Sequence, residues 1–207
     1  MSQSVGLAAQ EISCQRGGRV LFQDLSFALA PGEGLLITGP NGAGKTSLLR
    51  QIAGLLPLEA GRLSLDGASP GAELPELCHY VGHLNGIKTS FTVRENLAFW
   101  ADFLGETGGS VPRALSAFGL TPLADFPAGL LSAGQKRKLA LSRLFAAQRP
   151  IWLLDEPQAS LDASSLKLLE AAIKDHLDAG GIAVVASHTA LKTKFAHKAA
   201  LGGKRKP

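Results

Sequence analysis

Residues 39–46 read Gly39-Pro40-Asn41-Gly42-Ala43-Gly44-Lys45-Thr46. This stretch fits G-x-x-x-x-G-K-[ST], a glycine-rich loop whose backbone N–H groups turn inward around phosphates. A short apolar run at 35–38 precedes it, and a helical pattern at 47–55 follows it, beginning with Ser47. Strand, loop and helix in this order are the setting that the motif needs. We therefore expect a buried strand, a phosphate-binding loop and a helix whose N-terminus faces an anion.

Two side chains of the loop suit a nucleoside triphosphate with its metal ion. Lys45 supplies a point charge for the β- and γ-phosphates, and Thr46 offers a hydroxyl to Mg²⁺. The alternative is a glycine-rich turn without a ligand, but the complete pattern and both flanks favour the phosphate site.

The composition is that of a globular protein, with 45% hydrophobic and 18% charged residues in a chain of 207. No apolar run approaches the length of a membrane span, and residues 1–6 lack the features of a secretory signal. The two cysteines, Cys14 and Cys78, fit a reducing compartment. The net charge of +4 does not argue for nucleic acid, and the basic end at 202–207 is typical of a solvated tail. These features predict one domain, 1–207, in the cytoplasm or on the cytoplasmic face of a membrane.

The first part of the chain favours antiparallel β structure. Strand patterns at 11–15, 20–22 and 25–29 surround a glycine turn, and 61–67 alternates again between glycines. We expect an N-terminal antiparallel β subdomain that leads into the strand at 35–38.

A helical region follows the short strand predicted at 79–83, where Cys78 and His79 are interpreted as strand residues rather than ligands. Thr92 and Glu95 form the pattern of a capping box, and a helix is predicted from there to about residue 104. Further helices are expected at 111–118 and from Ser132 to 145. Residues 84–148 are therefore predicted to be a helical subdomain inserted in an α/β core.

Two carboxylates follow the continuous apolar run 151–154, which is typical of a buried parallel strand. Ligands of α/β sheets lie at the carboxyl ends of the strands, so Asp155 is expected to hold Mg²⁺. Glu156 is expected to polarise the attacking water as a general base. The alternative is an acidic turn without chemistry. A helix at 162–177 and a second buried strand at 182–187 complete the pattern, and His188 follows that strand.

A second anion site is predicted at residues 131–135, Leu-Ser-Ala-Gly-Gln. Ser132 is placed as the N-cap of the long helix, and Gly134 leaves the first turn open to an anion. The loop at 39–46 already holds one phosphate. A second site therefore requires another phosphate, or the same phosphate reached from another molecule.

These segments, in this order and over nearly the whole chain, resemble the nucleotide-binding domain of the ABC transporter superfamily. Residues 131–135 are similar to its LSGGQ signature with one Gly→Ala change. The resemblance implies a head-to-tail homodimer in which Ser132 and Gly134 contact the γ-phosphate of the partner's ATP. It implies that Ser160, Leu161 and Asp162 cross the dimer interface. It also identifies His188 with the histidine that contacts the γ-phosphate.

Two positions depart from that family's pattern. Arg16 lies near the place of an aromatic residue that stacks on adenine, and a guanidinium can stack there by its planar face. His83 stands in place of a glutamine that senses Mg²⁺ and the membrane partner. An imidazole can accept a hydrogen bond from a metal-bound water.

A narrower resemblance is to the ATP-binding subunits of the haem-exporter complex of cytochrome c maturation. It rests on Gly82-His83, Gly86-Ile87-Lys88-Thr89, Thr92, Glu95-Asn96-Leu97, the opening Gly18-Arg19-Val20-Leu21-Phe22 and the signature at 131–135. It implies a peripheral protein of the bacterial inner membrane that works with a separate integral-membrane permease and haem-handling membrane proteins. ATP hydrolysis would then drive haem export, or release of the haem-loaded chaperone.

The predicted fold is α/β, a P-loop NTPase core of ABC nucleotide-binding type with an N-terminal antiparallel β subdomain and an inserted helical signature subdomain. The alternative functions are a soluble ABC-type ATPase for iron–sulfur assembly and a P-loop kinase, which would not need the 131–135 element. The expected cofactors are ATP and Mg²⁺, and no nucleic-acid partner is expected. The predicted site residues are Glu156 and His188 for catalysis, Thr46 and Asp155 for the metal, and Gly39, Pro40, Asn41, Gly42, Ala43, Gly44, Lys45, Thr46, Ser47, Arg16, His83, Ser132, Gly134 and Gln135 for the nucleotide.

Overall fold

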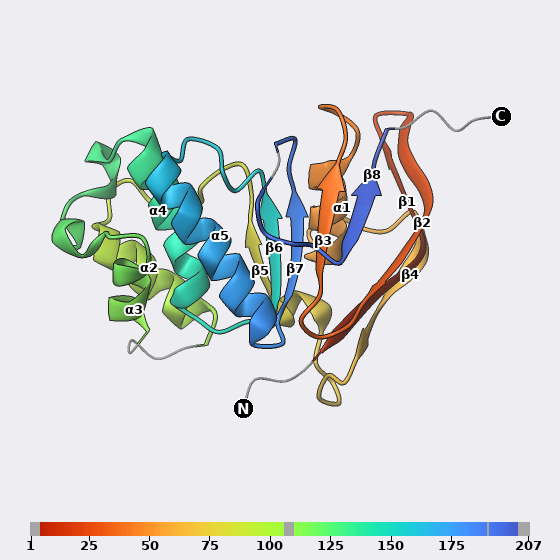
Figure 1. The fold of residues 1–207 in the computed structure, drawn as a ribbon, viewed down its shortest axis with the longest axis horizontal. Coiled ribbons are helices and arrows are strands. Elements are labelled where there is room, and N and C mark those ends of the chain that lie inside the picture. The colour runs from red at the N-terminus through yellow and green to blue at the C-terminus, as the bar shows by residue number, and fades with distance from the viewer. Residues whose placement is uncertain (1–4, 106–109, 190, 203–207) are drawn as a thin grey trace.

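Two β-sheets lie side by side in the chain, with helices packed between and around them (Figure 1). The computed structural model describes residues 5–105, 110–189 and 191–202. The strand order is β2-β1-β4 in the smaller sheet and β5-β6-β7-β3-β8 in the larger one. The basic residues 204–206 of the predicted tail lie outside the described residues.

The smaller sheet is antiparallel and contains β1 (Gly6–Arg16), β2 (Arg19–Leu29) and β4 (Ala60–Asp66). The hairpin turns at Gly17 and Gly18, both with positive φ, as the paired glycines predict. The prediction of separate strands at 20–22 and 25–29 was wrong, because β2 is continuous. Its pairing with β1 carries register shifts and resumes on either side of them, so the polar residues at 23–24 interrupt the alternation without ending the strand.

All strands of the larger sheet run parallel: β3 (Gly34–Thr38), β5 (Cys78–Val81), β6 (Ile151–Asp155), β7 (Ile182–Ala186) and β8 (His197–Ala200). Every residue of β6 and β7 is buried, which explains the unbroken apolar runs at residues 151–154 and 182–186. Because parallel strands end at the same edge, the segments after β3, β6 and β7 meet there. The predicted strand at 79–83 ends earlier, at Val81, so His83 lies in the loop beyond it.

Helices cover both faces of the parallel sheet. Helix α1 (Lys45–Ile52) packs between the two sheets, in a core shared with apolar residues of β1, β3, β6 and β7. Helix α5 (Ala163–Asp178) covers the opposite face (Figure 1). Helix α1 begins at Lys45, two residues before the apolar pattern that predicts it, because the phosphate loop winds directly into its first turn.

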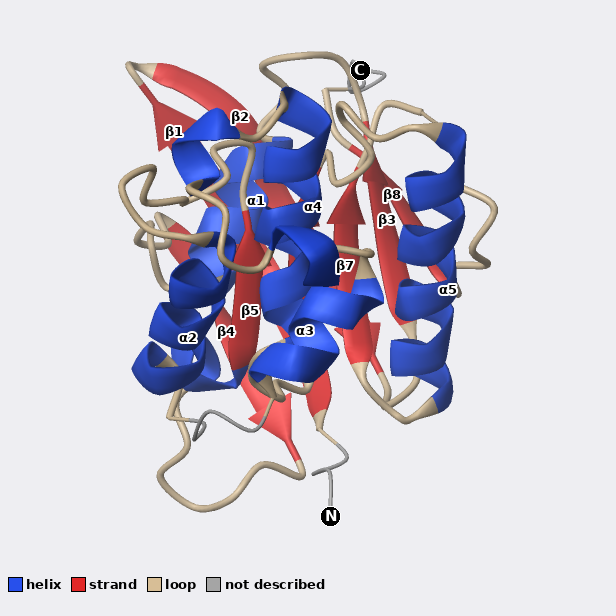
Figure 2. Cartoon of the chain, turned by 90° about the vertical axis from the view of Figure 1, so that its left-hand side faces the viewer, coloured by secondary structure: helices blue, strands red, loops and turns tan. Residues whose placement is uncertain are grey.

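A third apolar cluster lies within the predicted helical region, among α2 (Val93–Phe103), α3 (Val111–Ala117) and α4 (Ala133–Ser142) (Figure 2). Thr92 caps α2 in a capping box with Glu95, as predicted. Helix α4 ends at Ser142 rather than at 145, because its last turn tightens into a 3-10 turn. The limits 84–148 of a subdomain stay a prediction. The short 3-10 helices are η1 (Leu74–Leu77), η2 (Thr121–Leu123), η3 (Ala128–Leu130) and η4 (Arg143–Phe145).

His79 connects strand β5 to the end of the helical region. It is 2% exposed, and its Nε2 donates a hydrogen bond to the carbonyl of Ala147 at 2.8 Å. Burial lowers the pKa of His79 to about 3, so the ring is neutral in the folded protein. Burial also raises the pKa of the neighbouring Cys78 thiol to about 12. The interpretation of both residues as structural strand residues agrees with this environment.

Candidate active site

A cavity of about 560 Å³ lies at the carboxyl edge of the parallel sheet. Residues 41–47 of the phosphate loop line it together with Asp155 and Glu156 after β6 and His188 after β7. Arg16 at the end of β1 and His83 after β5 line it as well. The fold thus brings together most of the predicted site residues from segments that are far apart in the chain.

The phosphate loop folds tightly onto the start of α1. Gly44 is the N-cap residue with φ +102°, and a Cβ there would lie 3.0 Å from side-chain atoms of Leu21 and Phe22. Lys45 is buried, and its Nζ donates to the carbonyls of Gly39 at 2.8 Å and Pro40 at 3.3 Å. The ammonium therefore lies along the loop, against its first two carbonyls.

Thr46 and Asp155 provide two oxygen ligands that fit Mg²⁺. Thr46 Oγ1 donates to Asp155 Oδ2 at 2.8 Å, and Asp155 is 2% exposed. Mg²⁺ prefers hard oxygen donors and commonly takes few of them from the protein, completing its shell with phosphates and water. A buried carboxylate beside a hydroxyl at the foot of the phosphate loop matches that preference.

Glu156 is the most densely contacted acidic side chain of the cavity. Its Oε2 accepts hydrogen bonds from His188 Nδ1 at 2.7 Å, His188 N at 3.3 Å and Gln158 Nε2 at 2.9 Å. Its Oε1 lies 3.9 Å from Lys45 Nζ. The backbone of Glu156 has φ +45°, an unusual conformation for a residue other than glycine. The carboxylate is thus fixed beside the phosphate loop, in a position where it can accept a proton from water.

Gln158 also contacts the site, although no local motif indicates it. Its amide nitrogen lies 2.9 Å from the hydroxyls of Ser187 and Thr189 as well as from Glu156, so it joins the turn after β6 to the turn after β7. Its position two residues after Glu156 is visible in the sequence. Its partners after β7 follow only from the pairing of β6 with β7.

Ser132, Gly134 and Gln135 do not line the cavity. Ser132 caps α4 by accepting from Gln135 N at 3.2 Å, and Gln135 Oε1 accepts from Ser132 N at 2.9 Å. A Cβ on Gly134 would lie 2.9 Å from the carbonyl of Ser160, so glycine allows this close backbone approach. Within one chain, the second predicted anion site therefore forms as a capped helix start that is separate from the first.

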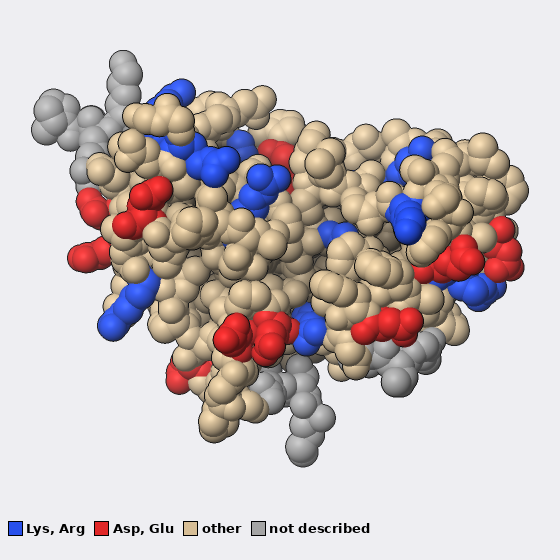
Figure 3. Space-filling view, turned by 180° about the vertical axis from the view of Figure 1, so that it is seen from behind, with Lys and Arg blue, Asp and Glu red and all other residues tan. Residues whose placement is uncertain are grey.

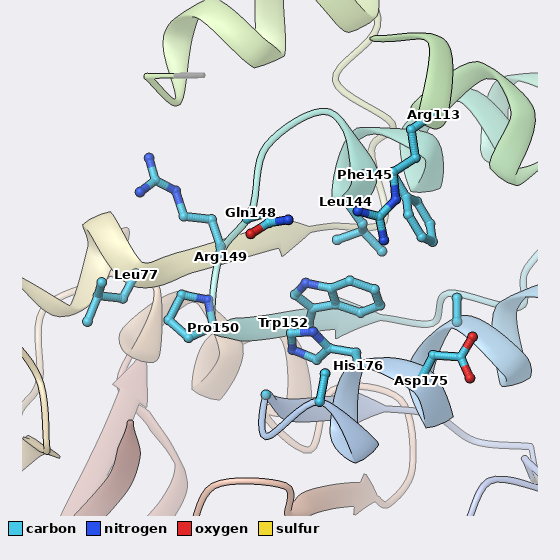
Figure 4. Close-up of a pocket in the computed structure, with 13 residues that line it drawn as sticks. Leu77, Arg113, Leu144, Phe145, Gln148, Arg149, Pro150, Trp152, Asp175 and His176 are labelled. Atoms are coloured by element: carbon cyan, nitrogen blue, oxygen red, sulfur yellow. The ribbon is translucent and has the colours of Figure 1, made fainter. Parts of the chain in front are cut away.

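A further cavity of about 520 Å³ lies at the amino ends of β6 and β7, opposite the candidate site (Figure 4). The rings of Trp152 and His176 stack in it with centroids 3.9 Å apart. Burial lowers the pKa of His176 to about 4. No predicted site residue lines this cavity, so we place the chemistry at the carboxyl edge.

Comparisons with known proteins agree with this geometry. Residues 22–159 match the family model described as ABC transporter. A cytochrome c biogenesis ATP-binding export protein CcmA from Rhizobium meliloti is 51% identical over 190 residues, which cover 89% of this chain and 92% of that protein. The protein of the same name from Rhodospirillum rubrum is 52% identical over 185 residues, covering 87% and 79%.

Two solved structures share the fold at lower sequence identity. An ABC transporter ATP-binding protein from Pyrococcus furiosus has a TM-score of 0.80 at 21% identity, covering 95% of this chain and 97% of that one. An ATP-binding subunit of an ABC transporter has a TM-score of 0.78 at 22% identity, covering 88% and 79%. These similarities confirm the predicted α/β fold with its two kinds of sheet.

Proposed function

Because the chain belongs to the ABC transporter family and is an ATPase of the ABC type, we propose that it supplies the energy for haem export in c-type cytochrome biogenesis. Hydrolysis would release the haem-loaded chaperone from the membrane complex. The observation that carries the proposal is the 51% identity, over 89% of the chain, to a cytochrome c biogenesis ATP-binding export protein. This similarity does not favour the alternative of a soluble ATPase for iron–sulfur assembly.

In the proposed reaction, different residues of the site bind the phosphates, hold the metal ion and activate the attacking water. The loop at 39–46 and the adjacent Ser47 surround the phosphates of ATP, and Lys45 leaves its carbonyl partners to meet the terminal phosphates. Thr46 and Asp155 would hold Mg²⁺, which would supply positive charge against the phosphates when bound. Glu156 accepts the proton of the attacking water, and His188 turns from Glu156 to the γ-phosphate. Arg16 would stack on the base by its planar face, and His83 would accept a hydrogen bond from water at the Mg²⁺ site.

We propose that the second anion site acts in a head-to-tail homodimer. Ser132 and Gly134 lie at the start of α4, where backbone N–H groups favour an anion, but they are absent from the lining of the cavity. A second copy can present this helix start to the γ-phosphate bound by the first. Gln135 stabilises the first turn of α4 through the capping box with Ser132.

The proposed permease contact lies beside helix α2. The exposed side chain of Phe103 lines a cavity of about 820 Å³ together with Tyr80 and Trp100, and the exposed Phe99 stacks on Phe103. An amphipathic helix at the cytoplasmic face of a separate integral-membrane subunit would place its apolar side here. Among the helices that the structure describes, none combines the length and apolar character of a membrane span. We therefore propose peripheral attachment to the cytoplasmic face of the inner membrane.

The distribution of charged side chains on one face does not favour binding of nucleic acid. On the face seen in Figure 3, the lysine and arginine side chains of the described residues lie among acidic ones rather than in one continuous stretch. A nucleic-acid groove concentrates basic side chains along a track. The expectation of no nucleic-acid partner stays a prediction.

The test is a pull-down of the tagged full chain from bacterial membranes, with and without ATP, in which the co-purifying chains are identified. We expect a multi-spanning permease together with haem-handling membrane proteins. Phe103→Asp should abolish this recovery, whereas Leu168→Asp, a matched exposed apolar residue on α5, should not. Recovery of a soluble scaffold without a permease would overturn the transporter role and leave the ATPase site in place.

A further inference from the structure

Arg137 is a buried cation that the sequence analysis did not single out. It lies on α4, two residues beyond the signature glutamine, and is 3% exposed although lysines flank it in the sequence. Burial lowers the pKa of Arg137, and the nearby carboxylates of Asp155 and Glu156 oppose that shift. A buried charge is costly unless its hydrogen-bonding groups are satisfied, so the contacts of this side chain carry information.

The guanidinium contacts the backbone of the turn that carries Glu156. Its Nη2 donates to the carbonyls of Asp155 and Glu156, each at 2.9 Å, and its Nε donates to the carbonyl of Pro157 at 3.1 Å. These are consecutive carbonyls, and the middle one belongs to the residue with φ +45°. A strained backbone persists only where its surroundings hold it, and Arg137 contacts this turn from the side of α4.

The remaining nitrogen of Arg137 reaches the loop that carries His83. Nη1 donates to the carbonyl of Gly82 at 2.8 Å and to Asn85 Oδ1 at 3.2 Å. One planar group thus joins the signature helix, the loop after β5 and the turn after β6. Lysine offers a compact ammonium on a flexible stem, so it cannot reproduce this fork of fixed donors.

A second buried arginine provides a comparison within the same molecule. Arg143 is 4% exposed, donates to the carbonyl of Tyr80 and stacks over Trp100 with its guanidinium carbon 4.5 Å from the ring centroid. Arg143 contacts β5, the following loop and α2, whereas the contacts of Arg137 extend to the turn with Glu156. Replacing each arginine in turn can therefore distinguish an effect on folding from an effect on the Glu156 carboxylate.

We propose that Arg137 is a positioning residue for hydrolysis, which fixes the backbone of Glu156 and couples it to the loop that carries His83. A movement of that loop, as when a membrane partner binds, shifts Gly82 and Asn85 and, through the guanidinium, the catalytic carboxylate. The inference deepens the proposed function because it concerns the same ATP site. Its test measures the turnover, ATP affinity and melting temperature of the purified chain, so it does not depend on what is transported.

The experiment compares Arg137→Lys with the control Arg143→Lys in the purified full chain, each assayed at the same interval below its own melting temperature. Arg137→Lys should lower kcat at least about tenfold, since small displacements of a catalytic group are costly, and change ATP affinity less than about threefold. Arg143→Lys should lower the melting temperature while changing kcat less than about threefold. Equal losses of kcat in both variants, or wild-type kcat in Arg137→Lys, would overturn the proposal.

A double-mutant cycle tests the coupling to the loop. The side-chain oxygen of Asn85 accepts a hydrogen bond from Arg137. Asn85→Ala should lower kcat about two- to fivefold in the wild-type background and leave it unchanged when Arg137 is already lysine, because coupled residues are not additive. If the loss of kcat in the double variant equals the product of the two single losses, the loop does not act through Arg137.

Discussion

At the scale of single residues, the site depends on how Glu156 is held. One of its oxygens accepts from His188 and Gln158, and the other lies 3.9 Å from the Lys45 ammonium. These contacts keep the carboxylate beside the phosphate loop, while the positive φ of Glu156 turns its side chain into the cavity. A general base in such a position contributes about 10²- to 10⁴-fold to a rate.

Glu156→Gln should therefore reduce ATP hydrolysis at least about 100-fold and leave ATP affinity within about threefold, because the amide fits the same place but cannot take the proton. The variant should also accumulate as an ATP-bound dimer. Turnover assays, equilibrium ATP binding and the mass in solution with MgATP check these outcomes. Glu59→Gln is the control on an exposed carboxylate outside the cavity. Wild-type turnover in Glu156→Gln would exclude Glu156 as the base.

At the scale of secondary structure, α2 and α4 begin with the same device. Thr92 with Glu95, and Ser132 with Gln135, each form a capping box around the first turn of a helix. The two N-caps contribute to stability by the same mechanism, about 1 kcal/mol each when replaced by alanine. Only the start of α4 carries the signature sequence. Thr92 can therefore serve as the control for Ser132, because both residues cap a helix in the same way.

Ser132→Arg should leave ATP binding intact and stop hydrolysis, because a long cation at this helix start would block the contact with the partner's nucleotide. Thr92→Arg should lose comparable stability and keep turnover in the isolated chain. Melting temperature, ATP binding and turnover of the two variants give the comparison. Equal turnover in both variants would contradict a functional role for the start of α4.

At the scale of the whole molecule, the separation of the phosphate loop from the signature in one chain favours a composite site between two chains. A mixture of two inactive variants, Lys45→Ala and Ser132→Arg, tests this arrangement. In head-to-tail heterodimers one site keeps an intact loop and an intact signature, so the mixture should recover roughly a quarter of wild-type turnover. A site completed within a single chain would give no recovery, and each variant alone serves as the control.

Most residues of the candidate site could be predicted because they belong to short sequence motifs. The glycine loop, the carboxylates after 151–154 and the capped start at Ser132 are motifs whose chemistry follows from nearby residues. Gln158 and Arg137 could not be found in this way. Their partners lie on segments that are remote in sequence, and a lysine-flanked arginine is more typical of a solvated helix face.

The sequence by itself determined the order of the elements and the chemistry of the phosphate loop, because periodicity, turn residues and motif spacing are local properties. It also indicated which strands are buried, since residues 151–154 of β6 and all residues of β7 are apolar. Only the tertiary structure decided that β2 continues past its polar residues, that Ser132 and Gly134 lie away from the loop at 39–46, and that Arg137 joins the His83 loop to Glu156. The physical reason is that strand pairing and the satisfaction of a buried charge depend on distant partners, which the fold alone brings within hydrogen-bonding distance.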